Sequence, residues 1–316
     1  MAEPVRRSGP DEARRGALYG FAAYLAWGAF PLYFHALIPA TALEILAHRI
    51  VWTFVLCLAI LLVRRDLAWL RPLARRRRLV AGISVAAVLV AINWVVYVEA
   101  VVSGNVTEAA LGYFLNPIVT VALGVFVLGE KLRPLQWVAV GVGLVAGVYL
   151  SVAGGRVPWI ALTLAFSFAG YGLAKKRVGA TLPALHSLTA ETIVLSPIAL
   201  GVIVWLGVTG QQTFTQGPPL HPALLILGGA ITAGPLILFA AAARRVPLVT
   251  IGLLQFVTPV LQLLCGVLLL GEHMSAERWI GFGIVWLALL LLSVDSLAAR
   301  PRRRREPAHD PEPCPS

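Results

Sequence analysis

Three ionisable side chains lie close together in an otherwise apolar run. The stretch LEILAHRIVW (43–52) contains Glu44, His48 and Arg49, and the run continues to Val63. A charge inside a bilayer costs at least a few kcal/mol, so such side chains are usually paired or face water. Glu44 and His48 lie one helical turn apart. The cluster can therefore lock helices through an ion pair, hold an anion, form a gate, or exchange protons, because imidazole titrates near physiological pH.

Other polar residues also recur at helical spacing. Glu108, Asn116 and neighbouring small or polar residues repeat at every fourth position, and Thr258 and Gln262 do the same later in the chain. Such stripes face protein or water, so they serve either interhelical hydrogen bonds or solute contact. Deep aromatic side chains likewise either pack or line a pocket. The candidates for solute contact or coupling are Glu44, His48, Arg49, Asn93, Trp94, Tyr97, Glu108, Tyr113, Asn116, Glu191, Gln255, Thr258 and Gln262.

Motifs for the common cofactors are absent from the sequence. It has no G-x-x-x-x-G-K-[ST] loop for ATP and no H-E-x-x-H or paired-cysteine motif for a metal. The string GVGLVA (141–146) matches a dinucleotide pattern, but it lies in an apolar run without a preceding strand. Cys57, Cys265 and Cys314 have no paired spacing. We therefore expect no cofactor, no metal and no catalytic residue.

The composition places these residues in a membrane protein. Hydrophobic residues make up 59% of the 316 positions, only 13% are charged, and the mean hydropathy is +0.82. A soluble domain of this size is much less apolar. At about 20 apolar residues per crossing, we predict an all-α integral membrane protein with ten transmembrane helices. The predicted spans are 17–37, 42–63, 79–101, 105–128, 134–153, 157–174, 183–206, 221–243, 247–270 and 277–297.

The basic residues predict the orientation of these spans. The chain has 26 lysines and arginines and a formal charge of +11. With the N-terminus inside, nearly all of them fall in inner segments, whereas Arg156 and Arg278 lie outside and Arg49 lies in a span. This asymmetry predicts cytoplasmic termini. It also accounts for the positive charge without nucleic acid, so the lipid bilayer and a small-molecule solute are the expected partners.

The chain contains an internal repeat. Residues 112–152 align without gaps to residues 254–294, and the same register aligns Arg49 with Glu191. Each half has five spans, and because five is odd the second half must be inverted, an arrangement typical of secondary transporters. The positions shared by the two halves include Pro117/Pro259, Gly129/Gly271, Glu130/Glu272 and Trp137/Trp279.

The repeat gives the domain organisation. We predict a basic cytoplasmic tail (1–15), two inverted five-helix repeats (16–153 and 154–297) and a disordered cytoplasmic tail (298–316). Prolines near mid-span free a carbonyl, which suits a hinge or a site, although packed helices also tolerate them. Gly143 and Gly147 suit a homodimer contact. The candidate hinges are Pro31, Pro117, Pro235 and Pro259.

Several of these motifs resemble one known family. EILAHRIVW (44–52), EAALGYFLNP (108–117) with LGEKL (128–132), and FAAAARRVPL (239–248) resemble the RarD-type permeases of the EamA branch of the drug/metabolite transporter superfamily. The resemblance covers residues 16–296. It implies a ten-helix permease of the bacterial inner membrane with cytoplasmic termini, working by alternating access. It implies no particular physiological substrate.

Together these patterns predict a secondary, ATP-independent transporter of a small organic solute or drug-like metabolite, and not an enzyme. Two alternatives stay open. An intramembrane enzyme would use Glu44, His48 and Arg49, but no nucleophile or metal set is evident at their depth. A soluble effector domain or a long extramembrane loop would favour the second alternative, a membrane receptor or assembly protein that transports nothing. The longest predicted outer loop, about 207–220, is short and polar.

Overall fold

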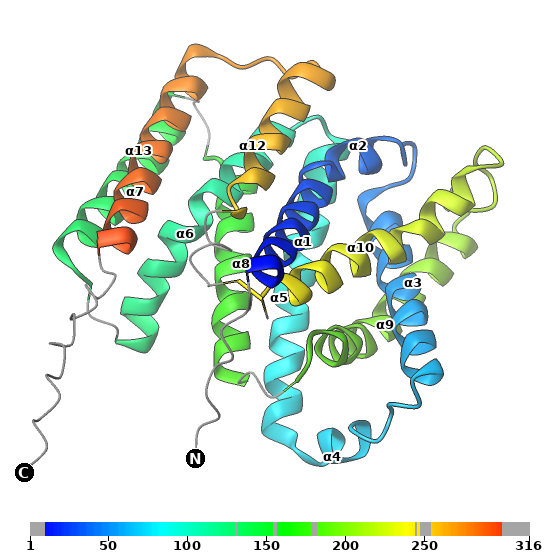
Figure 1. Cartoon of the computed structure of the whole chain (residues 1–316). Helices are drawn as coiled ribbons and strands as arrows, with labels where there is room; N and C mark the ends of the chain where they lie inside the picture. The colour runs from blue at the N-terminus through cyan, green and yellow to red at the C-terminus, as the bar shows by residue number, and fades with distance from the viewer. Residues whose placement is uncertain are drawn as a thin grey trace, which may run out of the picture.

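The computed structural model describes residues 10–129, 132–153, 157–178, 182–243, 245–246 and 254–298, and every regular element in these ranges is a helix (Figure 1). The rest of both predicted tails and residues 247–253 of predicted span nine lie outside the described residues. The helices are α1 (Pro10–Gly28), α2 (Phe30–His35), α3 (Ala42–Val63), α4 (Leu70–Arg75), α5 (Arg77–Val102), α6 (Val106–Leu128), α7 (Pro134–Ala153), α8 (Trp159–Val178), α9 (Ala184–Val208), α10 (His221–Ala243), α12 (Val257–Leu264), the π-helix η1 (Cys265–Leu269) and α13 (Ala276–Ala298).

Eight segments of the described chain are long and apolar enough to cross a membrane, and they coincide with eight of the predicted spans. The other two predicted spans, 157–174 and 247–270, coincide with α8 and with the shorter apolar stretch Val257–Leu269. α8 ends in the basic sequence KKRV, which makes it less apolar than its neighbours. The all-helical membrane class is confirmed, whereas the ten-span count stays a prediction.

The first span differs from its predicted bounds of 17–37. α1 already begins at Pro10, so residues 10–15 are helical. Proline suits the first helical position, and Asp11 and Glu12 lie in the first turn, where the helix dipole favours carboxylates. α1 ends at Gly28, and α2 restarts at Phe30 with Pro31 in its first turn. The apolar run alone could not reveal this polar first turn.

The helices of the two halves are interleaved. α1 packs against α10 and α12, whereas α8 packs against α5 and α6. α3 packs against α9, and α7 packs against α13; these two pairs lie at opposite edges of the bundle in Figure 1. The first helix of each half, α1 or α8, therefore packs against helices of the other half.

Close approach between helices depends on glycine at particular positions. A Cβ on Gly229 of α10 would lie 2.5 Å from the backbone carbon of Trp52 in α3, and a Cβ on Gly112 of α6 would lie 2.8 Å from the carbonyl oxygen of Ala161 in α8. Small residues at such positions let membrane helices pack backbone to backbone. Gly143 allows the same close approach within the chain, since a Cβ added there would lie 2.7 Å from the Ile118 side chain of α6. A homodimer through Gly143 and Gly147 stays a prediction.

We name the two ends of the bundle by their short helices. The α2 end carries α2 and the α9–α10 connection (209–220), and the α4 end carries α4 and residues 64–69 that precede it (Figure 1). α3 runs from the α2 end to the α4 end, and α9 runs the opposite way. Side chains early in α3 and early in α9 therefore lie near opposite ends.

Candidate solute-binding site

Arg49 lies in the first half of α3 and is 5% exposed. Its Nε donates a hydrogen bond of 2.7 Å to Thr232 Oγ1 of α10. Its guanidinium carbon lies 4.2 Å from the ring centroid of Trp94, 5.4 Å from that of Phe34 and 5.5 Å from that of Phe30. These distances are those of cation–π contacts, which stabilise a cation that has lost its water.

Arg49 has no ion-pair partner among the described residues. The sequence left an ion pair open as one role for Arg49, beside an anion site, a gate and proton exchange, and the described residues show no such pair. Glu191, its counterpart in the repeat, bonds to Lys175 instead. The reason is geometric, because Arg49 lies near the start of α3 at the α2 end, whereas Glu191 lies near the start of α9 at the α4 end.

Three tyrosines lie within electrostatic range of the Arg49 guanidinium: Tyr33, Tyr97 and Tyr113. The Tyr33 hydroxyl donates to the carbonyl of Leu224 at 2.7 Å. The rings of Tyr97 and Tyr113 meet edge to face, with centroids 5.6 Å apart. Aromatic side chains from α2, α5 and α6 thus enclose the guanidinium.

Asn93 orients the Tyr113 side chain of this aromatic enclosure. It accepts a hydrogen bond of 3.1 Å from the Tyr113 hydroxyl, and its amide donates to Leu164 O and Ser167 Oγ of α8, both at 3.0 Å. Because its hydrogen bonds all go to protein groups, Asn93 orients Tyr113 and ties α5 to α8.

Three buried polar atoms in this region have no hydrogen-bond partner: Arg49 Nη1, Tyr97 Oη and Gln262 Oε1. The Gln262 side chain lies beside the Tyr97 hydroxyl, and its amide donates to Trp27 O at 3.2 Å. Buried polar atoms are nearly always satisfied, so unpaired ones call for an explanation such as a missing ligand. We call the following residues the Arg49 cluster: Phe30, Tyr33, Phe34, Arg49, Trp94, Tyr97, Tyr113, Thr232 and Gln262.

Glu44 and His48 do not join the Arg49 cluster. The Glu44 carboxylate accepts hydrogen bonds from the backbone N–H of Thr213 at 2.6 Å and of Phe214 at 3.1 Å. His48 stacks on the Phe214 ring with centroids 4.7 Å apart and accepts a 3.3 Å hydrogen bond from Trp52. Both side chains therefore fasten the α9–α10 connection to α3.

Two more carboxylates bind helix N-termini at the α2 end. Glu108 accepts a hydrogen bond of 3.2 Å from the backbone N–H of Ile160, in the first turn of α8. Glu272 accepts from the backbone N–H groups of Val106 and Thr107, the latter at 2.8 Å, in the first turn of α6. Carboxylates are favourable at helix N-termini because the first N–H groups lack helical partners. We call the backbone contacts of Glu44, Glu108 and Glu272 the α2-end contacts.

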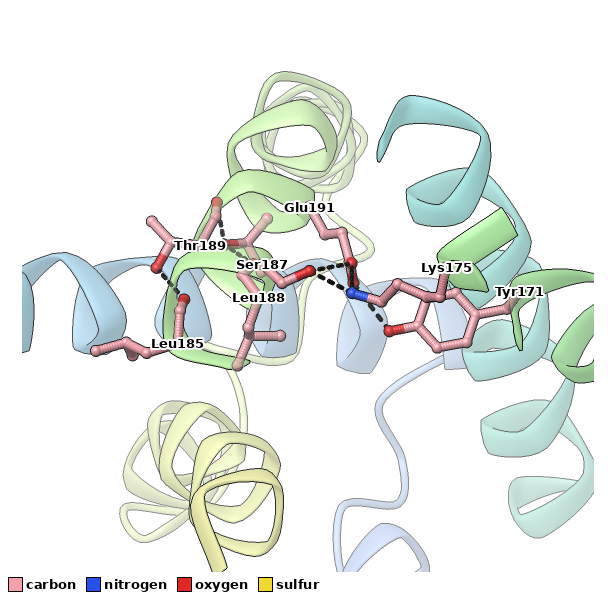
Figure 2. A network of polar contacts seen from close by, with 8 residues as sticks. Tyr171, Lys175, Leu185, Ser187, Leu188, Thr189 and Glu191 are labelled. Atoms are coloured by element: carbon pink, nitrogen blue, oxygen red, sulfur yellow. Dashed lines mark hydrogen bonds and ion pairs between the residues drawn. The ribbon is translucent and has the colours of Figure 1, made fainter. Parts of the chain in front are cut away.

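The α4 end holds a separate charged network (Figure 2). Glu191 is 3% exposed and accepts hydrogen bonds from Lys175, from Ser187 at 3.2 Å and from the Tyr171 hydroxyl at 3.2 Å. The Lys175 side chain is 31% exposed. The sequence placed Lys175 in a connection, but α8 continues to Val178, so this lysine projects from a helix toward α9.

The remaining candidates are dispersed. Thr258 donates to Tyr24 O at 2.8 Å, Gln255 is exposed, and the buried Asn116 Oδ1 has no partner. Pro117 and Pro235 lie inside α6 and α10, and Pro259 lies in the first turn of α12. The predicted residues that meet are thus Arg49, Trp94, Tyr97, Tyr113 and Gln262, with Asn93 behind them.

Sequence reasoning missed several residues. Phe30, Tyr33 and Phe34 look like ordinary packing residues, and Thr232 is an isolated threonine in an apolar run. One signal was available, because the repeat register that aligns Arg49 with Glu191 also aligns Tyr33 with Lys175. In each half these two positions interact, as Tyr33 with Arg49 and as Lys175 with Glu191.

A cavity of about 390 Å³ opens at the α2 end, apart from the Arg49 cluster. It lies beside the first turn of α6, and its lining includes Thr107, Glu108, His273 and Arg278. The Glu272 contact with Thr107 borders this cavity. The cavity is therefore a place where opening of the α2 end can be measured.

Comparisons with known proteins identify relatives of the whole chain. The profile of the EamA-like transporter family matches residues 14–153 and 157–294. A protein of Streptomyces exfoliatus named Protein RarD is 49% identical over 300 residues, which cover 94% of this chain and 95% of that protein. An uncharacterized transporter, YojE, of Bacillus subtilis is 40% identical over 286 residues, which cover 89% and 94%.

A solved crystal structure shares the fold. It aligns with a TM-score of 0.57 at 18% identity and covers 89% of this chain and 98% of its own. At this identity the likeness concerns the fold alone.

Proposed function

The chain belongs to the EamA-like transporter family as a RarD-type member, and from that membership we propose that it is a secondary permease of the bacterial inner membrane. The chain is a multi-pass membrane protein whose relatives are named transporters. The proposed activity is the movement of a small organic solute, or a drug-like metabolite, by alternating access without ATP.

The Arg49 cluster is the observation that carries this proposal. It combines a buried cation, an aromatic enclosure and three unpaired polar atoms. It draws residues from α2, α3, α5, α6, α10 and α12, that is, from both halves of the chain. Transporters built from inverted repeats place their solute site between the halves. We therefore assign solute binding to this cluster.

The interleaved packing supports ten spans in two inverted repeats. The family profile matches the two halves separately. The exchange of α1 and α8 between the halves is what a two-fold relation between them would produce. Orientation follows from charge, because the arginines of residues 64–78 lie at the α4 end, which the positive-inside rule makes cytoplasmic. The α2 end is then the outer end.

The α2-end contacts supply an outer gate in this proposal. Each of the three carboxylates joins a different pair of elements, and in this proposal these contacts break when the outer end opens. Interactions that exist in only one state of a two-state protein are what a solute or a proton can bias. The Lys175–Glu191 network is the corresponding charged contact at the inner end.

The contacts of Glu44 and His48 do not support the alternative of an intramembrane enzyme. An acid–base pair of Glu44 and His48 needs the two side chains to act on one another or on a shared substrate. Instead, Glu44 binds backbone N–H groups and His48 binds Trp52 and stacks on Phe214. These contacts favour a structural role for the pair.

A flux screen in proteoliposomes tests the proposal. Wild-type protein, Arg49→Ala and Glu108→Gln are compared across a broad panel of solutes, with and without a pH gradient, and Arg75→Gln on the exposed surface of α4 serves as the control. We expect wild type and Arg75→Gln to move at least one solute and Arg49→Ala to lose that flux. Folded wild-type protein that moves no solute in either direction would contradict the proposal.

A further inference from the structure

We infer that the Arg49 cluster selects an organic monoanion that also carries a neutral hydrogen-bonding group, such as a hydroxy acid or an amido acid. The inference rests on the proposed function, because it names the class of solute for the same site. It makes Arg49 the residue that determines specificity for charge.

Charge balance is the first argument. Every side chain that touches the Arg49 guanidinium is neutral, namely Phe30, Phe34, Trp94 and Thr232. The carboxylates of Glu44, Glu108 and Glu191 are bound to other groups. A buried cation without a counter-ion is costly. A bound anion of charge −1 would leave the site neutral, whereas a dianion or a cation would not.

Hydrogen bonding is the second argument. A guanidinium has five N–H donors in a planar fork that matches a carboxylate. In Arg49 the Nε donor is used by Thr232, whereas Nη1 has no partner. The rings in contact with the guanidinium, those of Phe30, Phe34 and Trp94, stabilise the charge but carry no oxygen to accept these donors. The missing acceptor is therefore an oxyanion of the solute.

The other unpaired atoms specify the rest of the solute. Tyr97 Oη can donate or accept, and Gln262 Oε1 can accept only. Gln262 Oε1 makes no hydrogen bond to the neighbouring Tyr97 hydroxyl in the structure, so a solute hydroxyl or amide N–H would satisfy it. No carboxylate of the described residues lines the cluster to pair with an ammonium group, so a neutral donor fits and a zwitterion does not. Phe30, Phe34 and Trp94 favour an apolar body next to the anion.

A binding assay with matched probes tests the inference. Purified full-length protein in detergent is titrated with four compounds that share a 4-hydroxybenzyl group: 4-hydroxyphenylacetate, its neutral amide, the cation tyramine and the zwitterion tyrosine. Further pairs of hydroxy acids with their amides widen the panel. Affinity is read from calorimetry and from the rise in melting temperature. We expect the acids to bind at least about tenfold more tightly than their amides, since charge-assisted hydrogen bonds are strong.

Substitutions at Arg49 separate the effect of its charge on binding from effects on folding. Arg49→Gln should reduce the preference for acids over amides to less than about threefold. Arg49→Lys keeps the charge without the fork, so it should keep the preference at lower affinity. Arg75→Gln should behave as wild type. If Arg49→Gln fails to fold, the ratio of acid to amide affinity in the wild-type protein still decides, because amides that bind as tightly as the acids would overturn the inference.

The outcomes also separate this inference from the proposed function. Amides, amines or zwitterions that bind as well as the acids would overturn it, and so would a panel in which no acid binds. Acids that bind through Arg49 but are not moved in proteoliposomes would support the inference and contradict the permease. Flux of neutral solutes without acid binding would support the permease and contradict the inference.

Discussion

At the residue scale, Arg49 and Glu191 occupy equivalent positions in the sequence repeat but have different surroundings. Arg49 is surrounded by neutral groups, whereas Glu191 has a lysine and two hydroxyls as partners (Figure 2). A buried ion is tolerated when it is paired and hydrogen-bonded, and costly when it is not. The paired Glu191 is therefore suited to stabilise the fold, whereas the unpaired Arg49 is suited to bind a solute.

This contrast predicts coupled stability at the α4 end. Lys175→Gln leaves the buried Glu191 without its cation, and Glu191→Gln removes the acceptor of Lys175. We expect each variant to be destabilised, and the double variant to recover about 1–3 kcal/mol relative to additivity. Thermal or denaturant unfolding of the four proteins in detergent measures the coupling. Strictly additive effects would show that the ion pair contributes nothing.

Arg49, Trp94, Tyr97, Tyr113 and Gln262 could be predicted from the sequence because polar and amphipathic side chains stand out in apolar runs. Their partners on α2 could not be predicted, since phenylalanine is expected everywhere in a membrane helix. The repeat aligns Arg49 with Glu191, but the two side chains lie near opposite ends of the bundle, so the alignment did not identify neighbours in space.

At the element scale, helix packing decides where the cluster can form. α10 approaches α3 at Gly228 and Gly229, beside Arg49. A Cβ on Gly228 would lie 2.9 Å from the Tyr33 hydroxyl and 3.8 Å from the Arg49 Cα. The contact between α3 and α10 therefore places Thr232, one turn further along α10, against the guanidinium.

Gly229 and Gly234 of α10 form a matched pair for testing this contact. A Cβ on Gly229 would clash with the α3 backbone, whereas a Cβ on Gly234 meets nothing within 4 Å. We expect Gly229→Ala to lose about 1–3 kcal/mol of stability and to impair flux. Gly234→Ala should be neutral or slightly stabilising, since alanine favours helix. Equal stabilities in unfolding assays would refute the assigned contact.

The α2-end contacts yield a second prediction at this scale. Glutamine at position 272 has one acceptor oxygen and no charge, so Glu272→Gln should loosen the first turn of α6. With the native cysteines replaced, the thiol of Thr107→Cys would report opening of the adjacent cavity. We expect a membrane-impermeant thiol reagent to label it several-fold faster in Glu272→Gln.

Glu99→Gln serves as the control for the labelling experiment, because Glu99 is an exposed acid near the end of α5, at the same end of the bundle but outside the lining of this cavity. Its labelling rate should equal that of wild type. Unchanged labelling in Glu272→Gln would remove Glu272 from the gate.

The helices themselves were largely predictable, because the apolar runs fix the middle of each span. Their ends were not. α1 extends to Pro10 through a polar first turn, and α8 extends through Lys175 to Val178. Helix capping and long basic side chains let a helix continue beyond its apolar part. Glu272 was visible as a repeat marker, but its contact with α6 depends on packing between distant segments.

At the scale of the whole molecule, the proposal requires two inverted halves that exchange their first helices. The sequence repeat and the two family matches support it. Such an arrangement gives two similar ways of packing the halves, which is the basis of alternating access. The α2-end contacts would then belong to the state that is closed to the outside.

Reporter fusions test the proposed topology. A reporter active only outside the inner membrane is inserted in the α9–α10 connection (209–220) or in residues 64–69, and a cytoplasmic reporter is inserted at the same places. We expect external activity at the first site and cytoplasmic activity at the second. The opposite result would invert the assignment of the outer gate, and equal activity at both sites would contradict the span count.

The central claim is that the solute site of this permease is the Arg49 cluster. It is tested most directly by an experimental structure of the protein bound to a solute that it transports. The account predicts density for the solute against Trp94 and Tyr97, with a solute oxygen within hydrogen-bond distance of Arg49 Nη1. Density for that solute in the cavity beside Thr107, or at Glu191, with the Arg49 cluster unchanged, would contradict it.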